Sequence, residues 1–202
     1  MQIHWKIFIS SLFVVVLMAC QSEPKMEEIE ESDMNEEAIE TRADAEESTV
    51  VSLMNQDEVD VGQAVLKQTK KGVEITVKAS HLPPGEHGFH FHEKGSCEAP
   101  TFESAGGHFN PDDKKHGFDH PEGPHAGDIE NLEVMEDGTV DATFLNDRVT
   151  LEKDKANSLF SEEGTALVIH ADPDDYYSQP AGDSGDRIAC GVISPSKETS
   201  LE

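Results

Sequence analysis

The sequence predicts an all-β fold, a closed or nearly closed antiparallel β-barrel or sandwich of about eight strands, on three observations. From Thr49 onward, short segments alternate apolar and polar residues with the period of two that is typical of half-buried strands. Turn-forming dipeptides separate several of these segments, so neighbouring strands should be antiparallel. The same region contains no convincing helix.

The individual strands follow from this alternation. Val73, Ile75 and Val77 share one face of their segment, and Lys71-Gly72 supplies the turn before it. Asp137-Gly138, with alternating segments on both sides, is a strong hairpin signal. The expected strands are, in order, Val50–Met54, Gln63–Lys67, Val73–Lys78, His87–Glu93, residues 132–134, residues 140–144, Thr165–His170 and Ile188–Ile193.

Two long stretches between these strands carry little strand signal. They run from Gly95 to Gly127 and from Ala171 to Asp186, and both are rich in Gly, Pro and Asp. Loops of such length without secondary structure are usually functional, because otherwise the entropy lost in ordering them is not recovered. We therefore expect the functional site to involve these two loops.

The first residues indicate export. A basic start at Lys6 is followed by an apolar run too short to span a bilayer comfortably, so residues 1–19 are predicted to be a secretory signal peptide. Leu17-Met18-Ala19-Cys20 resembles a bacterial lipoprotein box, in which Cys20 becomes the lipid-modified first residue. Ordinary cleavage and an uncleaved anchor are the alternatives. The expected location is the bacterial cell envelope, on a membrane and facing the periplasm or the extracellular space.

Composition divides the rest of the chain. Residues 20–47 are dominated by Glu, which predicts a solvated, lipid-anchored linker; an acidic surface helix is the alternative. Residues 48–196 form the expected domain, and residues 197–202 form a tail. The formal net charge of -27 argues against nucleic acid as a partner and repels anions at long range.

The cysteines indicate an oxidising compartment. If Cys20 carries lipid, only Cys97 and Cys190 remain. An exported protein with two remaining cysteines usually pairs them.

Histidines are concentrated in and beside the first long loop. His90 and His92 alternate on a predicted strand, so both face one side while the neighbouring phenylalanines fill the barrel; alone, such a pair is more often a polar surface than a metal site. Further donors follow at His108, His116, His120, His125, Asp128 and, later, His170. This density of nitrogen and oxygen donors is typical of a zinc or copper site.

Two runs carry a specific family resemblance. Residues 88–98 and residues 182–193 resemble signatures of the copper/zinc superoxide dismutase family, and the similarity extends from Val50 to Ser194. The resemblance implies an eight-stranded antiparallel Greek-key β-barrel or sandwich with two long functional loops. It also implies conversion of superoxide to oxygen and hydrogen peroxide by alternating Cu(II) and Cu(I).

The resemblance also implies the metal ligands, one copper and one zinc per subunit. Copper would be bound by His90, His92, His108 and His170, and zinc by His108, His116, His125 and Asp128. His108 would bridge the metals as an imidazolate and supply one proton. Of the other histidines, His81, His87 and His120 are expected to bind no metal.

Four more residues match family positions. Asp174 would link a copper-ligand imidazole to a zinc-ligand imidazole, with a solvated loop Asp as the alternative. Cys97 and Cys190 match the family's internal disulfide. Arg187 would draw superoxide toward copper; the alternative is a surface ion pair with one of the neighbouring aspartates, Asp183 or Asp186.

One departure and two other readings limit these expectations. The second long loop contains no lysine, whereas animal enzymes of the family use lysines there to steer the anion, so fast turnover does not follow. A lipoprotein that only buffers metal on the same fold is the main alternative, and it would be favoured by a missing copper ligand; none is missing. An adhesive β-sandwich would require both family matches to be accidental. The sequence leaves monomer and homodimer open.

Overall fold

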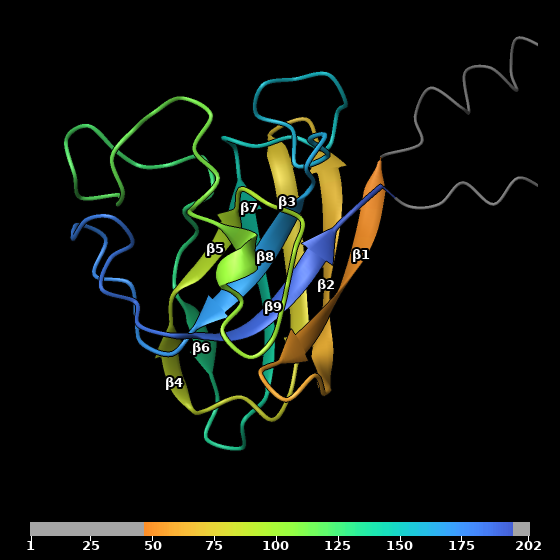
Figure 1. Ribbon diagram of the computed structural model, residues 1–202, viewed down its shortest axis with the longest axis vertical. Coiled ribbons are helices and arrows are strands. Elements are labelled where there is room, and N and C mark those ends of the chain that lie inside the picture. Colours follow the sequence, from red (N-terminus) through yellow and green to blue (C-terminus); the bar gives the residue numbers. More distant parts are fainter. Residues whose placement is uncertain (1–46, 196–202) are drawn as a thin grey trace, which may run out of the picture. The chain divides into compact units, whose positions relative to one another are not determined.

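The computed structural model describes residues 47–195 (Figure 1). The predicted signal peptide, the predicted lipidation site Cys20, nearly all of the predicted linker and the C-terminal tail lie outside the described residues. Within them, no helix is long and apolar enough to cross a membrane. The only helical element in this part of the chain is a short 3₁₀ turn, η1, at Glu103–Ala105.

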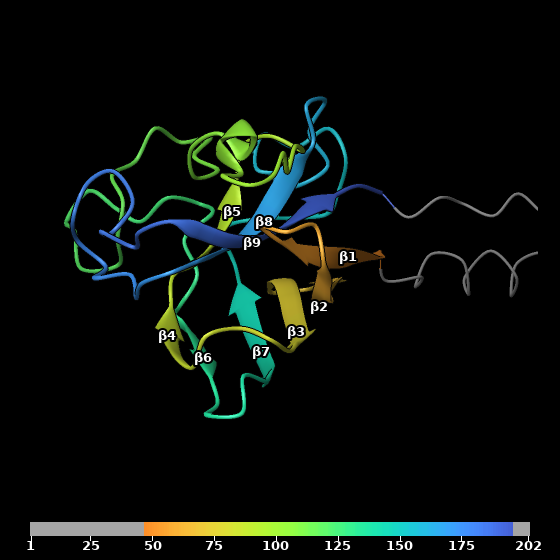
Figure 2. The same cartoon turned by 60° about the horizontal axis from the view of Figure 1, so that its bottom comes forward.

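The described chain is an antiparallel β-structure, as predicted. Its strands are β1 (Ser48–Asn55), β2 (Asp60–Thr69), β3 (Gly72–Ala79), β4 (Gly85–His87), β5 (Phe89–His92), β6 (Leu132–Val134), β7 (Val140–Asn146), β8 (Thr165–His170) and β9 (Arg187–Ile193). Seven of them form one sheet in the order β5-β8-β9-β1-β2-β3-β7, and β4 pairs with β6 in a second sheet. The seven-stranded sheet curls into a barrel-like body (Figures 1 and 2).

Two details differ from the sequence prediction. The expected strand His87–Glu93 is broken at Gly88, whose amide donates to the carbonyl of Asp172, so that β4 and β5 belong to different sheets. The tight turn at Asp137-Gly138 forms, but the strands it joins pair elsewhere, β6 with β4 and β7 with β3. Alternation predicted the strands and their buried faces, and it carried no information on which partner each strand takes.

The core lies inside the curl of the sheet. Phe89 and Phe91 of β5 are fully buried, as predicted, and the Phe89 ring lies 5.5 Å from that of Phe144 on β7. Leu53, Ile75 and other apolar residues of the alternating strands complete the cluster. Because the phenylalanines occupy the inner face of β5, the histidines between them point to the other side, toward the long loops.

The predicted disulfide is present. Cys97, in the first loop, is bonded to Cys190 of β9, 93 positions later in the sequence. Cys190 lies in a small buried cluster with Phe102, Ala105 and two residues of β8. The bridge therefore fixes the first part of the loop, including η1, against the sheet.

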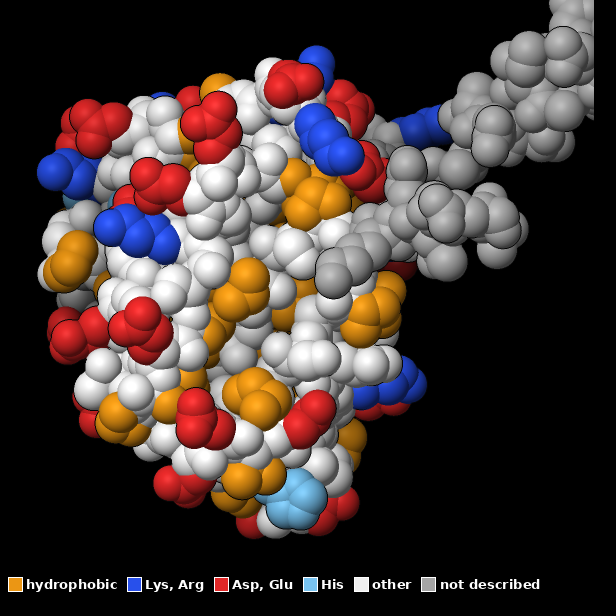
Figure 3. All heavy atoms as spheres, turned by 45° about the vertical axis from the view of Figure 1, so that its right-hand side comes forward, with side chains coloured by type: hydrophobic (Ala, Val, Ile, Leu, Met, Phe, Trp, Pro, Cys, Tyr) orange, Lys and Arg blue, Asp and Glu red, His pale blue; other side chains and the backbone are white. Residues whose placement is uncertain are grey.

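The two long loops lie on one side of the barrel, and the ends of the described chain lie on the other (Figures 1 and 2). At those ends, the Thr49 hydroxyl donates to the carbonyl of Ser194 at 2.7 Å. Figure 3 shows the face near the chain ends, where acidic and apolar side chains are interspersed.

Candidate metal centre

Four histidines from three parts of the chain form the first group. His90 and His92 come from β5, His170 ends the neighbouring strand β8, and His108 follows η1 and pairs with His92 through an isolated β-bridge. All four are buried, and one ligand atom from each lies within 4.8 Å of the others. These are the four residues expected to bind copper.

The second group contains the four residues expected to bind zinc. His108, His116, His125 and Asp128 are buried, and their ligand atoms also lie within 4.8 Å of one another. An Asp128 oxygen lies 2.9 Å from His108 Nδ1, and its carboxylate lies 3.2 Å from the Nδ1 atoms of both His116 and His125. Asp128 also accepts hydrogen bonds from the backbone amides of Gly117 and His125, which fix its orientation.

Hydrogen bonds select one nitrogen on each copper-group ring as the metal donor. His92 Nδ1 donates to the carbonyl of Gly106 at 3.0 Å, and His170 Nδ1 lies 3.3 Å from the carbonyl of Gly185. Their Nε2 atoms therefore carry no proton and lie 3.3 Å from each other. In His90 the roles are reversed, because Nε2 contacts Asp174 and leaves Nδ1 free.

Whether the two groups suit copper and zinc can be judged from buried nitrogens that have no hydrogen-bond partner. Among the described residues, His90 Nδ1, His108 Nε2, His116 Nδ1 and His125 Nδ1 are such atoms. An unpaired buried polar atom is costly, and a bound cation would satisfy each of these. Imidazole donors suit copper, and three imidazoles with one carboxylate suit zinc, so the residues fit both metals.

Asp174 links the two groups, as predicted. Its carboxylate accepts from His90 Nε2 at 2.8 Å and from His116 Nε2 at 2.9 Å. Asn131, which sequence reasoning missed, holds Asp174 by accepting from its backbone amide and donating to its carbonyl. Asn131 had no signal in the sequence, because its contacts are to the backbone of a distant loop.

Burial sets the charge of the copper-group histidines in the metal-free chain. It lowers the pKa of His90 to about 4 and the pKa values of His108 and His170 to about 3. It also lowers the pKa of His92 well below its usual value. These imidazoles are therefore neutral at pH 7, which is the form that binds a metal.

In the zinc group, by contrast, charged forms are favoured in the metal-free chain. Burial disfavours charge on His116, but the nearby carboxylates of Asp128 and Asp174 outweigh it and raise the pKa of His116 to about 9. Burial would raise the pKa of Asp128, yet its contacts with the surrounding histidines, that with His108 first, hold the pKa far below its usual value. Hydrogen bonds from His116 and His90 likewise lower the pKa of Asp174. Asp128 is therefore ionised at neutral pH and can bind zinc as a carboxylate.

A hollow of about 420 Å³ opens onto these groups, and Arg187 lies in its wall. The guanidinium donates to the carbonyls of Phe102 and Gly106, at 2.6 Å each, and within the described chain it forms no ion pair with Asp183 or Asp186. Burial lowers the pKa of Arg187, but the ordinary pKa of a guanidinium is so high that Arg187 stays positively charged at neutral pH. The rest of the lining includes His92, Glu93, His108, Asn110, Asp113, His125, His170, Pro180 and Ala181. None of the described residues that line this hollow is a lysine.

The other three histidines among residues 47–195 lie outside both groups. His87 is buried, with its ring nitrogens 2.8 Å from the carbonyl oxygen of His170 and 2.7 Å from that of Pro83. His120 Nδ1 accepts from the amide of Glu122, and the exposed His81 contacts its neighbour Ser80. None of the three belongs to either metal-binding group.

Together, the curled antiparallel sheet and two four-residue groups that share one histidine define a two-metal protein of the copper–zinc class. A family model described as copper/zinc superoxide dismutase matches residues 60–193. The chain belongs to the copper/zinc superoxide dismutase family. Conversion of superoxide to oxygen and hydrogen peroxide, with copper and zinc as cofactors, is therefore its activity.

Relatives and solved structures agree. The chain is 56% identical to "Superoxide dismutase [Cu-Zn] 1" of Aquifex aeolicus over 146 residues, 72% of this chain and 86% of that protein. A superoxide dismutase-like protein from Bacillus subtilis has a crystal structure that is 44% identical, with a TM-score of 0.70, covering 71% of this chain and 97% of that one. The copper/zinc superoxide dismutase of Brucella abortus is 31% identical, with a TM-score of 0.61, covering 73% of this chain and all of that one.

Proposed function

We propose that this superoxide dismutase binds copper through His90, His92, His108 and His170 and zinc through His108, His116, His125 and Asp128. The observation that carries the assignment is the position of His108. Its Nε2 is buried without a protein partner, whereas its Nδ1 lies against Asp128 in the zinc group. One imidazole thus faces both groups, as a bridging ligand must.

Bound copper would supply the one-electron redox chemistry by which two superoxide ions and two protons become one oxygen and one hydrogen peroxide. The chain supplies position and charge. Arg187 holds a fixed positive charge at the wall of the hollow, where it attracts the anion. His108 Nε2 is the atom at which one of the two protons is held and then released.

Asp174 and the zinc group hold this arrangement in place. Through His90 and His116, the Asp174 carboxylate connects the copper group to the zinc group and to the second loop. Outer hydrogen bonds of this kind fix the tautomer and the ring orientation of metal-binding histidines. The zinc group therefore acts as a structural support for the copper group.

We also propose that the enzyme is an exported lipoprotein of a bacterial cell envelope, attached to a membrane by lipid on Cys20, where it protects the envelope from oxidative damage. The apolar run before Cys20 supports this. The ends of the described chain lie on the side of the barrel away from the two long loops (Figures 1 and 2). Mass spectrometry of the mature protein tests the claim, and an unmodified Cys20 within a chain that starts elsewhere would end it.

Metal analysis of the purified chain, combined with a cyanide-sensitive dismutase assay, tests the catalytic proposal. We expect one copper and one zinc per chain, and activity that cyanide abolishes. A chain that binds both metals but does not accelerate dismutation would instead be a metal buffer. Analytical ultracentrifugation of the same sample distinguishes monomer from homodimer.

A further inference from the structure

The peptide unit that joins Gly106 to Gly107 has contacts at both ends. Its carbonyl oxygen accepts from His92 Nδ1 at 3.0 Å and from Arg187 Nη2 at 2.6 Å. Its N–H group donates to Glu93 Oε1 at 3.0 Å. One planar group therefore connects a carboxylate to both a copper-group histidine and the arginine of the hollow.

The chain is built to bring Glu93 to this peptide. Glu93 directly follows His92, and its backbone amide donates to the carbonyl of Gly107 at 2.9 Å, so main chain and side chain both hold Gly107. Gly106 has a φ of 76°, and a Cβ placed on it would lie 2.5 Å from Glu93 Oε1. Only glycine allows the carboxylate to approach so closely.

We propose that Glu93 is a positioning residue for dismutation, acting through the Gly106–Gly107 peptide on His92 and Arg187. A peptide group is planar, so fixing its N–H direction fixes the direction of its carbonyl. A charged acceptor on the N–H also polarises the group, which strengthens the hydrogen bonds made by its oxygen. The inference rests on the proposed role of His92 as a copper ligand.

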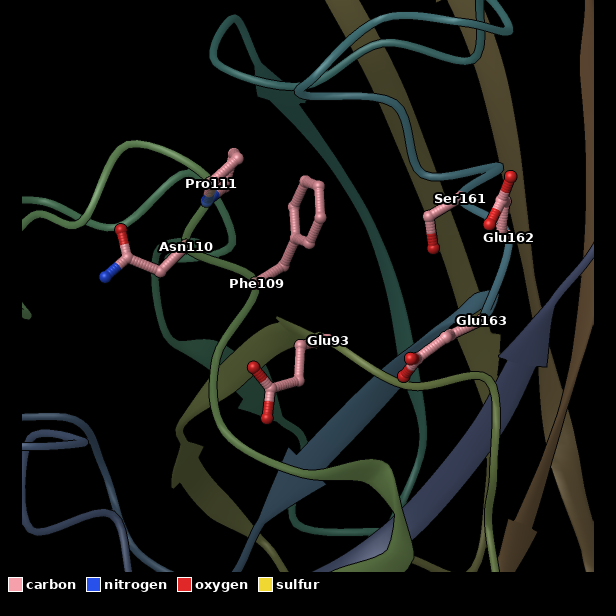
Figure 4. Close-up of a pocket in the computed structure, with 7 residues that line it drawn as sticks. All are labelled: Glu93, Phe109, Asn110, Pro111, Ser161, Glu162 and Glu163. Carbon is pink, nitrogen blue, oxygen red and sulfur yellow. The ribbon is translucent and has the colours of Figure 1, made fainter.

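Because Glu93 lies beside the copper hollow, its negative charge would also repel superoxide, and this effect on the rate is opposite to that of positioning. Glu93 lines the copper hollow and also a neighbouring hollow of about 340 Å³. In Figure 4 the Glu93 carboxylate turns toward the segment that leads to Phe109, and Glu162 and Glu163 lie across this neighbouring hollow from that segment. A carboxylate that only repelled superoxide would slow capture, so its removal would speed the enzyme. Removal of a positioning carboxylate would instead slow the enzyme.

The experiment compares Glu93→Ala, Glu93→Gln and Glu163→Ala in the full chain loaded with copper and zinc. Glutamine loses the charge but keeps an oxygen that can accept from Gly107, whereas alanine loses both. For Glu93→Ala we expect kcat/KM to fall about fivefold, equivalent to about 1 kcal/mol, together with a changed Cu(II) EPR spectrum and unchanged metal content. Glu93→Gln should restore the spectrum and most of the rate. Glu163→Ala, which removes a carboxylate from the neighbouring hollow that Glu93 also lines, should change neither.

Two outcomes would overturn the proposal: a Cu(II) EPR spectrum that Glu93→Ala leaves unchanged, or a rate that rises in both Glu93 variants. Failure of the ligand assignment has a different signature, because His92→Ala would then keep the original spectrum. If His92→Ala alters the spectrum and Glu93→Ala does not, the ligand assignment stands and only the positioning role is wrong.

Discussion

Removing the Cys97–Cys190 bridge should destabilise the metal-free chain by an amount that follows from its place in the sequence. The bridge closes a loop of 93 positions, for which chain entropy gives about 4.6 kcal/mol at 25 °C. With a slope of about 2 kcal/mol per molar urea, the unfolding midpoint of a Cys97→Ala/Cys190→Ala variant should fall by about 2 M. Alanine suits this test because Cys190 lies in an apolar cluster, where a serine hydroxyl would add its own cost.

The assay is urea unfolding followed by circular dichroism, after chelation of both metals, because bound metals would add stability of their own. Reduction of the unsubstituted chain should shift the midpoint by a similar amount without replacing any residue. Cys20→Ser is the matched control: it removes the cysteine outside the described domain and should leave the midpoint unchanged. Midpoints of the oxidised chain and the double variant within about 0.5 M of each other would refute the reasoning.

Three further predictions concern the metal groups and the hollow. The rate constant for superoxide capture should stay flat or rise as salt is added, because salt screens the distant acidic charge before the short-range attraction. Asp113→Asn, which removes a carboxylate from the copper hollow, should raise this rate constant at low salt. A steep fall of the rate constant with salt would contradict the reasoning. His170→Ala should abolish dismutation and leave zinc bound, whereas Asp128→Ala should chiefly weaken zinc, and full copper-dependent activity in the His170 variant would show that the ligand assignment is wrong. In the metal-free chain the pKa values of His90 and His108 are lowered to about 4 and about 3, against about 6.5 in an unfolded chain. The unfolded chain thus binds protons first, so the free energy of unfolding should fall as pH drops from about 6.5 toward 4; urea midpoints at pH 7 and pH 5 that coincide would contradict this.

Residue types indicated a metal site in the first long loop, because nitrogen and oxygen donors are dense there. The division of these donors into a copper group and a zinc group came from the family resemblance, since spacing alone left His90 and His92 open to interpretation as a polar surface. The support around them was harder to predict. The Gly106 carbonyl that holds His92 and Arg187 is a backbone atom, and any residue would supply one.

Strand pairing was predicted less well than strand position. Period-two alternation shows which face of a segment is buried, so Phe89 and Phe91 were placed correctly in the core. It does not show that Gly88 bonds to the backbone at Asp172 and His170 and so divides one expected strand between two sheets. Those bonds link segments more than 80 residues apart, which no local pattern records.

The meeting of the chain ends beside Thr49 and Ser194 makes the barrel a good candidate for circular permutation. A short peptide could join the ends of β1 and β9, and the chain could be reopened at the exposed turn Lys153–Lys155 without cutting a strand or either metal-bearing loop. The rearranged order would move any attached tether to a different point of the barrel. If the proposed lipid anchor on Cys20 holds the enzyme to a membrane, such a permuted chain would test whether the direction in which the copper hollow faces affects its activity.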